Sequence, residues 1–198
     1  MRQFASSGFR LWNLSPEAKL VYTAFGLFSL LALVASALLY EEMVGTGTRG
    51  VRKYYLGEPH AASEPAKLAP QEPGPQMALP EEEFSGPAIT VAMPYRKLLE
   101  VTHFHLFTVP VFLLIVAHLF MLTDLSSRAK MVWIAGGWGA ALAHLGAPWA
   151  VRYGGVAWAP MYVGSGLALA ITSAVLTLFP IWVMWRGAPE ARRKRRDK

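Results

Sequence analysis

The sequence predicts an all-α membrane protein: a four-transmembrane-helix bundle with a long Pro-rich periplasmic connection between its first two helices. Of the 198 residues, 54% are apolar and only 16% are charged, against about 25% charged in a typical soluble domain. The charges gather in short stretches and leave four long apolar runs between them. Because about 20 apolar residues cross about 30 Å of hydrocarbon, each run is long enough to span a membrane.

The four spans and their connections use nearly all of the chain, so we expect no separate soluble domain. The first span carries no charge between Lys19 and Glu41. Ala35-Ser36-Ala37 follows its apolar part as a signal-peptidase site would, but we expect the segment to be retained as an anchor. The predicted order is a cytoplasmic N-terminus (1–19), a first span (20–40), a periplasmic Pro-rich segment (41–97), three further spans (98–122, 131–151 and 156–185) and a basic cytoplasmic tail (186–198).

The connection between the first two spans has two parts. Residues 45–48 read as a turn, and residues 51–56 read as a short interfacial helix that holds its tyrosines at head-group level. From Glu58 to Pro94 the chain has eight prolines, many acidic residues and few aromatic ones. Such a composition cannot bury a core of its own, so we expect this part to be extended.

Small residues in the third span predict close helix packing. Gly136-xxx-Ala140 and Gly137-xxx-Ala141 both match the small-xxx-small pattern, and Gly164-xxx-Ala168 repeats it in the fourth span. A glycine-lined wall would also leave room for a flat cofactor. The two interpretations do not exclude each other.

Lysine and arginine counts set the expected orientation. With the N-terminus inside, 12 basic residues fall on the inner side and seven on the outer side. Because basic loops stay in the cytoplasm, we expect both termini inside, in a bacterial inner membrane. Seven of the 19 basic residues lie between Arg186 and Lys198, where they suit a contact with the lipid bilayer better than with nucleic acid, for which no recognition motif is present.

Histidines carry the main chemical signal. Four of the five lie inside predicted spans: His103, His105 and His118 in the second, and His144 in the third. Ionisable side chains at membrane depth are costly and uncommon, which makes them functional candidates. The chain has no cysteine, which excludes thiolate metal sites, iron–sulfur clusters and covalent c-type haem attachment.

Depth groups three of these histidines together. At about 1.5 Å per residue, His103, His105 and His144 share one level near the outer face, and His118 lies near the inner face. At about 100° per residue, His103 and His105 differ by about 200°, so one face of a regular helix cannot present both. Pro110 lies between the two levels and can bend the helix.

Two histidines at one depth on different helices suit a b-type haem, whose iron takes axial nitrogens from opposite sides. His144 with either His103 or His105 could supply them, and the choice stays open. His118 lies about 22 Å from His103 along the helix, a separation that suits a second haem. The first and fourth spans contain no histidine, so His118 has no histidine partner at its level within the chain.

The second span also resembles a known kind of helix. Residues 98–110, LLEVTHFHLFTVP, and the later Ala117-His118 are similar to the two-histidine helix of cytochrome b membrane subunits such as those of formate dehydrogenases and nitrate reductases, which are four- and five-helix bundles. The resemblance implies haem b, electron exchange with quinone, and partners among the other membrane or periplasmic subunits of a redox complex.

Three hypotheses about function follow. The leading one is a membrane electron-transfer subunit with a b-type haem near the periplasmic face, acting within a larger respiratory or redox complex. The second is a cofactor-free structural or anchoring subunit. The third is a copper or zinc site formed by His103, His105 and His144. No nucleophile–base pair or phosphate loop indicates an enzyme acting alone, and we expect Glu100 to pair with Arg96 or Lys97, and Asp124 to cap a turn or pair with Arg128.

Overall fold

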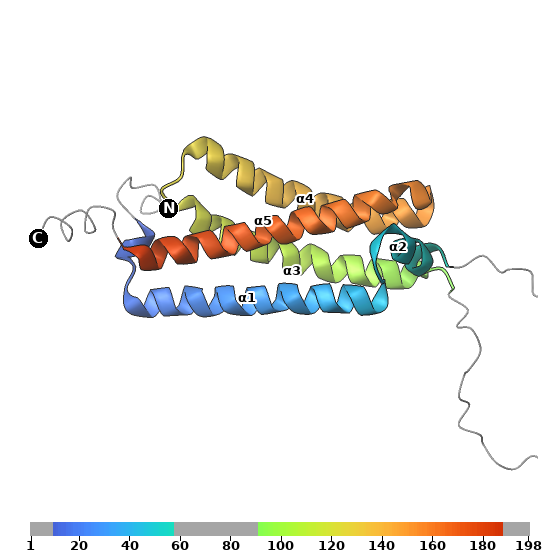
Figure 1. Ribbon diagram of the computed structural model, residues 1–198, viewed down its shortest axis with the longest axis horizontal. Helices are drawn as coiled ribbons and strands as arrows, with labels where there is room; N and C mark the ends of the chain where they lie inside the picture. Colours follow the sequence, from blue (N-terminus) through green and yellow to red (C-terminus); the bar gives the residue numbers. More distant parts are fainter. Residues whose placement is uncertain (1–9, 58–90, 188–198) are drawn as a thin grey trace, which may run out of the picture.

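The computed structural model describes residues 10–57 and 91–187, and every regular element in these ranges is a helix (Figure 1). The all-α fold class is therefore confirmed. The predictions for the N-terminal residues, most of the Pro-rich segment and the basic tail lie outside the described residues. The elements are η1 (Leu11–Asn13), α1 (Pro16–Met43), α2 (Gly47–Leu56), α3 (Tyr95–Met121), α4 (Ser127–Gly154), η2 (Val156–Trp158) and α5 (Ala159–Arg186).

Capping residues fix where the long helices begin. The hydroxyl of Ser15 accepts a hydrogen bond from the N–H of Ala18 at the start of α1, and Ser126 does the same for the N–H of Ala129 in α4. These contacts satisfy N–H groups that the helix itself leaves unpaired. Because Ser126 starts α4 early, the helix is longer than the predicted third span. The expected short helix is present as α2, which begins at Gly47, inside the expected turn; its place in the membrane interface stays a prediction.

Three helices of the described chain are long and apolar enough to cross a membrane: α1, α3 and the continuous segment Val156–Arg186. Helix α4 has 28 residues, as α1 does, but does not meet the same criterion of length and hydropathy. Its glycines and tryptophans, with His144 and Pro148, lower the mean hydropathy of the uncharged stretch between Lys130 and Arg152. The fourth membrane span stays a prediction.

Helices α4 and α5 pack side by side over much of their length (Figure 1). Gly137 is buried there, and a Cβ atom at this position would lie 3.2 Å from Cδ1 of Leu176 on α5. The predicted close approach is confirmed at Gly137. Gly164 differs, because a Cβ atom there would meet nothing within 4 Å, so this glycine does not mark a helix contact in the described chain.

Buried side chains form three layers along the bundle. We call them the α2-end cluster, the central cluster and the η1-end cluster. The first includes Val51, Tyr55, Leu98, Ala147, Val151 and Tyr162, the second Leu113, Val116, Phe120, Ala141 and Leu176, and the third Leu11, Leu119, Val183 and Met184. Each layer joins helices that are distant in sequence, so the layers define levels against which the histidines can be placed.

The two described ends of the Pro-rich segment are held together at the α2 end. The N–H of Met93 donates a hydrogen bond to the carbonyl of Tyr55 at 3.3 Å. Nε of Arg152 donates to the carbonyl of Met93 at 2.9 Å. The chain therefore leaves the bundle after α2 and re-enters it beside the same helix.

Helix α1 lies at the edge of the bundle, and Gly26 is its only buried residue. A Cβ atom on Gly26 would lie 2.4 Å from Cδ1 of Ile181 on α5. We expect Gly26→Leu to lower the free energy of unfolding by about 1–3 kcal/mol through overpacking, measured as the midpoint of SDS-induced unfolding. Ala35→Leu, on an exposed part of α1, is the matched control. Equal stability of the two variants would contradict the contact.

Candidate functional site

His105 lies on the inward face of α3 and yet is exposed. At about 100° per residue, it is within about 20° of both Leu98 and Val116, which are each 1% exposed. Leu98 belongs to the α2-end cluster and Val116 to the central cluster. Exposure of a residue between two buried ones on the same face means that neighbouring helices do not cover α3 at this level.

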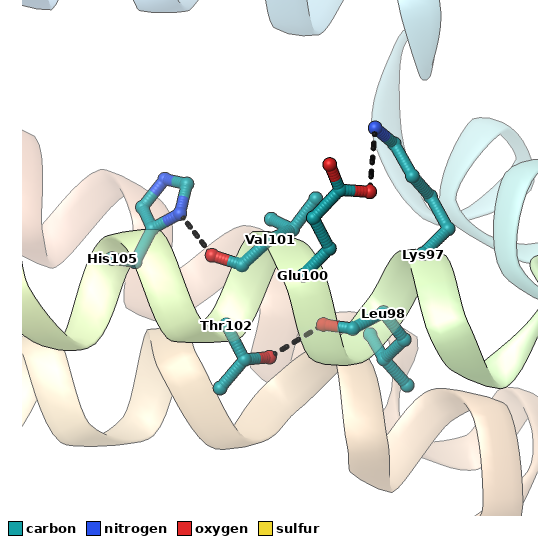
Figure 2. A network of polar contacts seen from close by, with 6 residues as sticks. All are labelled: Lys97, Leu98, Glu100, Val101, Thr102 and His105. Atoms are coloured by element: carbon teal, nitrogen blue, oxygen red, sulfur yellow. Dashed lines mark hydrogen bonds and ion pairs between the residues drawn. The ribbon is translucent and has the colours of Figure 1, made fainter.

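Hydrogen bonding fixes which ring nitrogen of His105 is free. Nδ1 of His105 lies 2.7 Å from the carbonyl oxygen of Val101, one turn earlier (Figure 2). A carbonyl can only accept, so Nδ1 must carry the proton. Nε2 then has a lone pair, and Figure 2 shows this second nitrogen directed away from the carbonyl. A histidine held in this way can act as a metal ligand through Nε2.

His144 occupies a fitted place between α4 and α5. Its ring packs against Tyr162, with 4.9 Å between the ring centroids. Gly166 makes room for it, because a Cβ atom there would lie 3.0 Å from Cε1 of His144. Ser165, one residue before Gly166, lies 3.3 Å from Nδ1 of His144 through its hydroxyl oxygen. Tyr162, Ser165 and Gly166, which lie within about one turn of α5, thus surround the ring of His144 on α4.

The same argument assigns the tautomer of His144. The hydroxyl of Ser165 donates its only hydrogen to the carbonyl of Tyr162 at 3.1 Å, so its oxygen accepts from Nδ1 of His144. Nε2 of His144 therefore carries a lone pair, as Nε2 of His105 does. His105 and His144 thus each have one ring nitrogen that can bind an electrophile such as a metal ion.

The other two histidines lie outside this level or on another face. His103 is exposed and packs edge-on against Phe107, with 5.1 Å between centroids. At about 100° per residue it is about 200° from His105, and so turns away from the inward face of α3. His118 is exposed as well, and its Nδ1 lies 2.9 Å from the carbonyl of Leu114. His118 has the same tautomer as His105, at a different depth.

Tyrosines line the α2 side of the His144 position. Tyr162 packs against Tyr55, with 5.4 Å between centroids, and stacks on Tyr40 at 6.0 Å. Tyr55 is 5% exposed. Burial, aided by the neighbouring Tyr162, raises the pKa of Tyr55 far above its ordinary value. The phenol therefore stays neutral at any physiological pH and closes this end of the bundle without adding charge.

Polar residues around α3 hold its first turns in place. Glu100 pairs with Lys97 at 3.4 Å, which confirms that sequence prediction (Figure 2). Thr102 donates to the carbonyl of Leu98 at 2.8 Å and accepts a 2.9 Å hydrogen bond from Nε1 of Trp149 on α4. Helices α3 and α4 are therefore joined one turn from His105. These contacts position the helix and do not involve the ring of His105.

The third hypothesis required three histidines around one metal ion. Within residues 10–57 and 91–187, no group of three or more histidine, aspartate or glutamate side chains is placed to hold a metal ion. His103 does not join His105 and His144 because it projects from another side of α3. His105 and His144 remain as two candidate nitrogen ligands on different helices, and two is the number that a haem iron requires from a protein for six-coordination.

Comparison with known proteins gives one family. A family model described as a transmembrane helical domain matches residues 45–195. The chain belongs to this family, Aq_1264_TM. The matched region contains α2 to α5 and all four histidines considered above, whereas α1 precedes it. No curated protein and no solved structure matches the chain. Membership confirms a membrane protein and names no cofactor or reaction.

Proposed function

We propose that this chain is a membrane electron-transfer subunit that binds one b-type haem through His105 and His144, near the α2 end of the bundle. The observation that carries the proposal is the exposure of His105 on the inward face of α3, between two buried layers. His144 is half-buried on α4 nearby, and hydrogen bonds leave Nε2 free on both rings.

The chemistry of these residues fits the group. A bound haem b would supply a one-electron carrier. Val101 and Ser165 hold the Nδ1 protons and so orient the two rings, which is how outer groups commonly fix histidine ligands. Tyr162 and the rest of the α2-end cluster exclude water from one side of the His144 ring. Of the two ligand choices that the sequence leaves open, this geometry supports His105 over His103.

The proposal includes a topology. Helix α4 runs beside α5 as the fourth span, with its basic residues at the two ends in the membrane interfaces. Both termini lie in the cytoplasm of a bacterial inner membrane, by the positive-inside rule. The α2 end then faces the periplasm, where a redox partner or quinone would exchange electrons with the haem. A second haem at His118 is not part of this proposal.

The direct test is an absorption and pyridine-haemochrome spectrum of the full chain purified from membranes of a haem-producing host. We expect the α-band of haem b at about one haem per chain, the stoichiometry of one bis-histidine site. Protein without haem b, although folded by circular dichroism and expressed with haem precursor supplied, would overturn the proposed function.

The packing of His144 favours one alternative, a cofactor-free anchoring subunit. Tyr162, Ser165 and Gly166 form a complete place for the ring, so His144 also serves to join α4 and α5. On this alternative, a triple replacement of His103, His105 and His144 by glutamine leaves the partner complex assembled and active. Loss of electron transfer without loss of assembly would exclude it in favour of the haem site.

A further inference from the structure

A shallow, open apolar groove runs along one face of α5 near the η1 end, away from His105 and His144. It has a volume of about 320 Å³ and is lined by Ala174, Val175, Leu178, Phe179 and Trp182. Along the helix axis these residues cover eight steps, or about 12 Å, close to the depth of one leaflet of a bilayer about 30 Å thick. The groove therefore has the length and lining of a place for one hydrocarbon chain.

Cationic side chains from separate parts of the chain meet near this end. The guanidinium of Arg186 lies 4.5 Å from the ring centroid of Trp182, the last groove residue, and pairs with Asp124. Nζ of Lys130, near the start of α4, donates a 2.7 Å hydrogen bond to the carbonyl of Met121, three residues before Asp124 in the sequence. Two cations, Arg186 and Lys130, against one carboxylate leave this cluster with a net charge of +1.

One donor in the cluster has no acceptor. Nε of Arg186 is buried and has no hydrogen-bond partner among the described residues. A buried donor without an acceptor is unfavourable, and the cost is larger for a charged group. An anion bound beside Arg186 would supply the acceptor and balance the excess charge. Phosphate oxygens suit a guanidinium especially well.

We propose that the groove and this cationic cluster together bind one anionic phospholipid, with an acyl chain against Ala174 to Trp182 and the phosphate beside Arg186 and Lys130. The cluster lies at the end of the helix and the groove extends from it into the hydrocarbon, in the same order as the head group and acyl chain of a phospholipid. Basic clusters at the cytoplasmic ends of membrane helices are recognised sites for anionic head groups. The site is independent of any haem.

Native mass spectrometry of the full chain in detergent micelles tests the proposal. The probes are dioleoyl phosphatidylglycerol and, as the zwitterionic comparison, dioleoyl phosphatidylcholine. We expect tighter binding of phosphatidylglycerol, and a weakening of about fivefold for each cation removed in Lys130→Gln and Arg186→Gln. Ala174→Phe, which fills the groove, should weaken both lipids. Arg52→Gln, on exposed α2 at the other end of the bundle, should weaken neither.

Lys130→Gln is the decisive variant, because it leaves the Arg186–Asp124 ion pair in place. A melting temperature equal to that of the parent protein shows that it remains folded. Equal binding of the two lipids by the parent protein would overturn the proposal. So would a phosphatidylglycerol preference that survives in both cation variants, or groove filling that leaves both lipids bound as before.

Discussion

Replacing His105 with alanine will remove the haem b signal from the purified protein, and replacing His103 with alanine will leave it unchanged. The two residues are of one type, two positions apart on α3, and both are exposed. Only His105 shares the inward face with buried Leu98 and Val116. Loss of an outer partner of a metal ligand already costs about 10–100-fold in affinity, so loss of the ligand itself should cost at least as much.

The measurement is the ratio of haem to protein from the pyridine-haemochrome spectrum, with circular dichroism as the check on folding. His144→Ala should match His105→Ala, since the iron needs both nitrogens for six-coordination. Loss of haem in His103→Ala with retention in His105→Ala would reverse the ligand assignment. Haem retained in all three variants would exclude the site.

A second large effect is expected at Gly166, a residue without a side chain that lies against the ring of His144. In Gly166→Leu, the new Cβ atom would lie 3.0 Å from Cε1 and 3.3 Å from Nδ1 of His144. The ring must leave its place against Tyr162 and Ser165, so Nε2 loses its orientation. We expect haem occupancy to fall by about tenfold or more, as when other supporting groups of metal ligands are removed.

Gly164→Leu is the matched control, two residues away on the same helix. A Cβ atom there meets nothing within 4 Å, so haem occupancy and stability should stay close to those of the parent protein. The Gly166 variant should also unfold at lower SDS concentration, by about 1–3 kcal/mol, whether or not haem is present. Equal behaviour of the two variants by both measurements would contradict the fitted place of His144.

The sequence predicts one level for His103, His105 and His144, because the rise of a helix converts position directly into depth. The sequence does not choose between His103 and His105, because that choice depends on which face of α3 turns toward α4 and α5. That orientation is set by the packing of Leu98, Val116 and their neighbours on other helices. The 100° rotation per residue gives only the angle between two residues on one helix, and does not show which of them faces a neighbouring helix.

Two further features depended on the register between distant segments. The small-xxx-small pattern drew attention to Gly164, whereas the glycine that admits His144 is Gly166. Asp124 was expected to cap a turn or pair with Arg128, but the structure pairs it with Arg186. That pairing arises because the end of α3 and the end of α5 meet at the η1 end of the bundle (Figure 1), 62 residues apart in sequence.

The hydrogen bond from Met93 to Tyr55, with the second one from Arg152 to Met93, affects how long the segment between α2 and α3 can be. Tyr55 and Met93, near the two ends of the segment between α2 and α3, are held next to each other. The length of the segment therefore does not alter the distance between its ends. Doubling a flexible loop costs only about 0.6 kcal/mol in closure entropy. A longer segment between these two ends would therefore cost the described helices little stability.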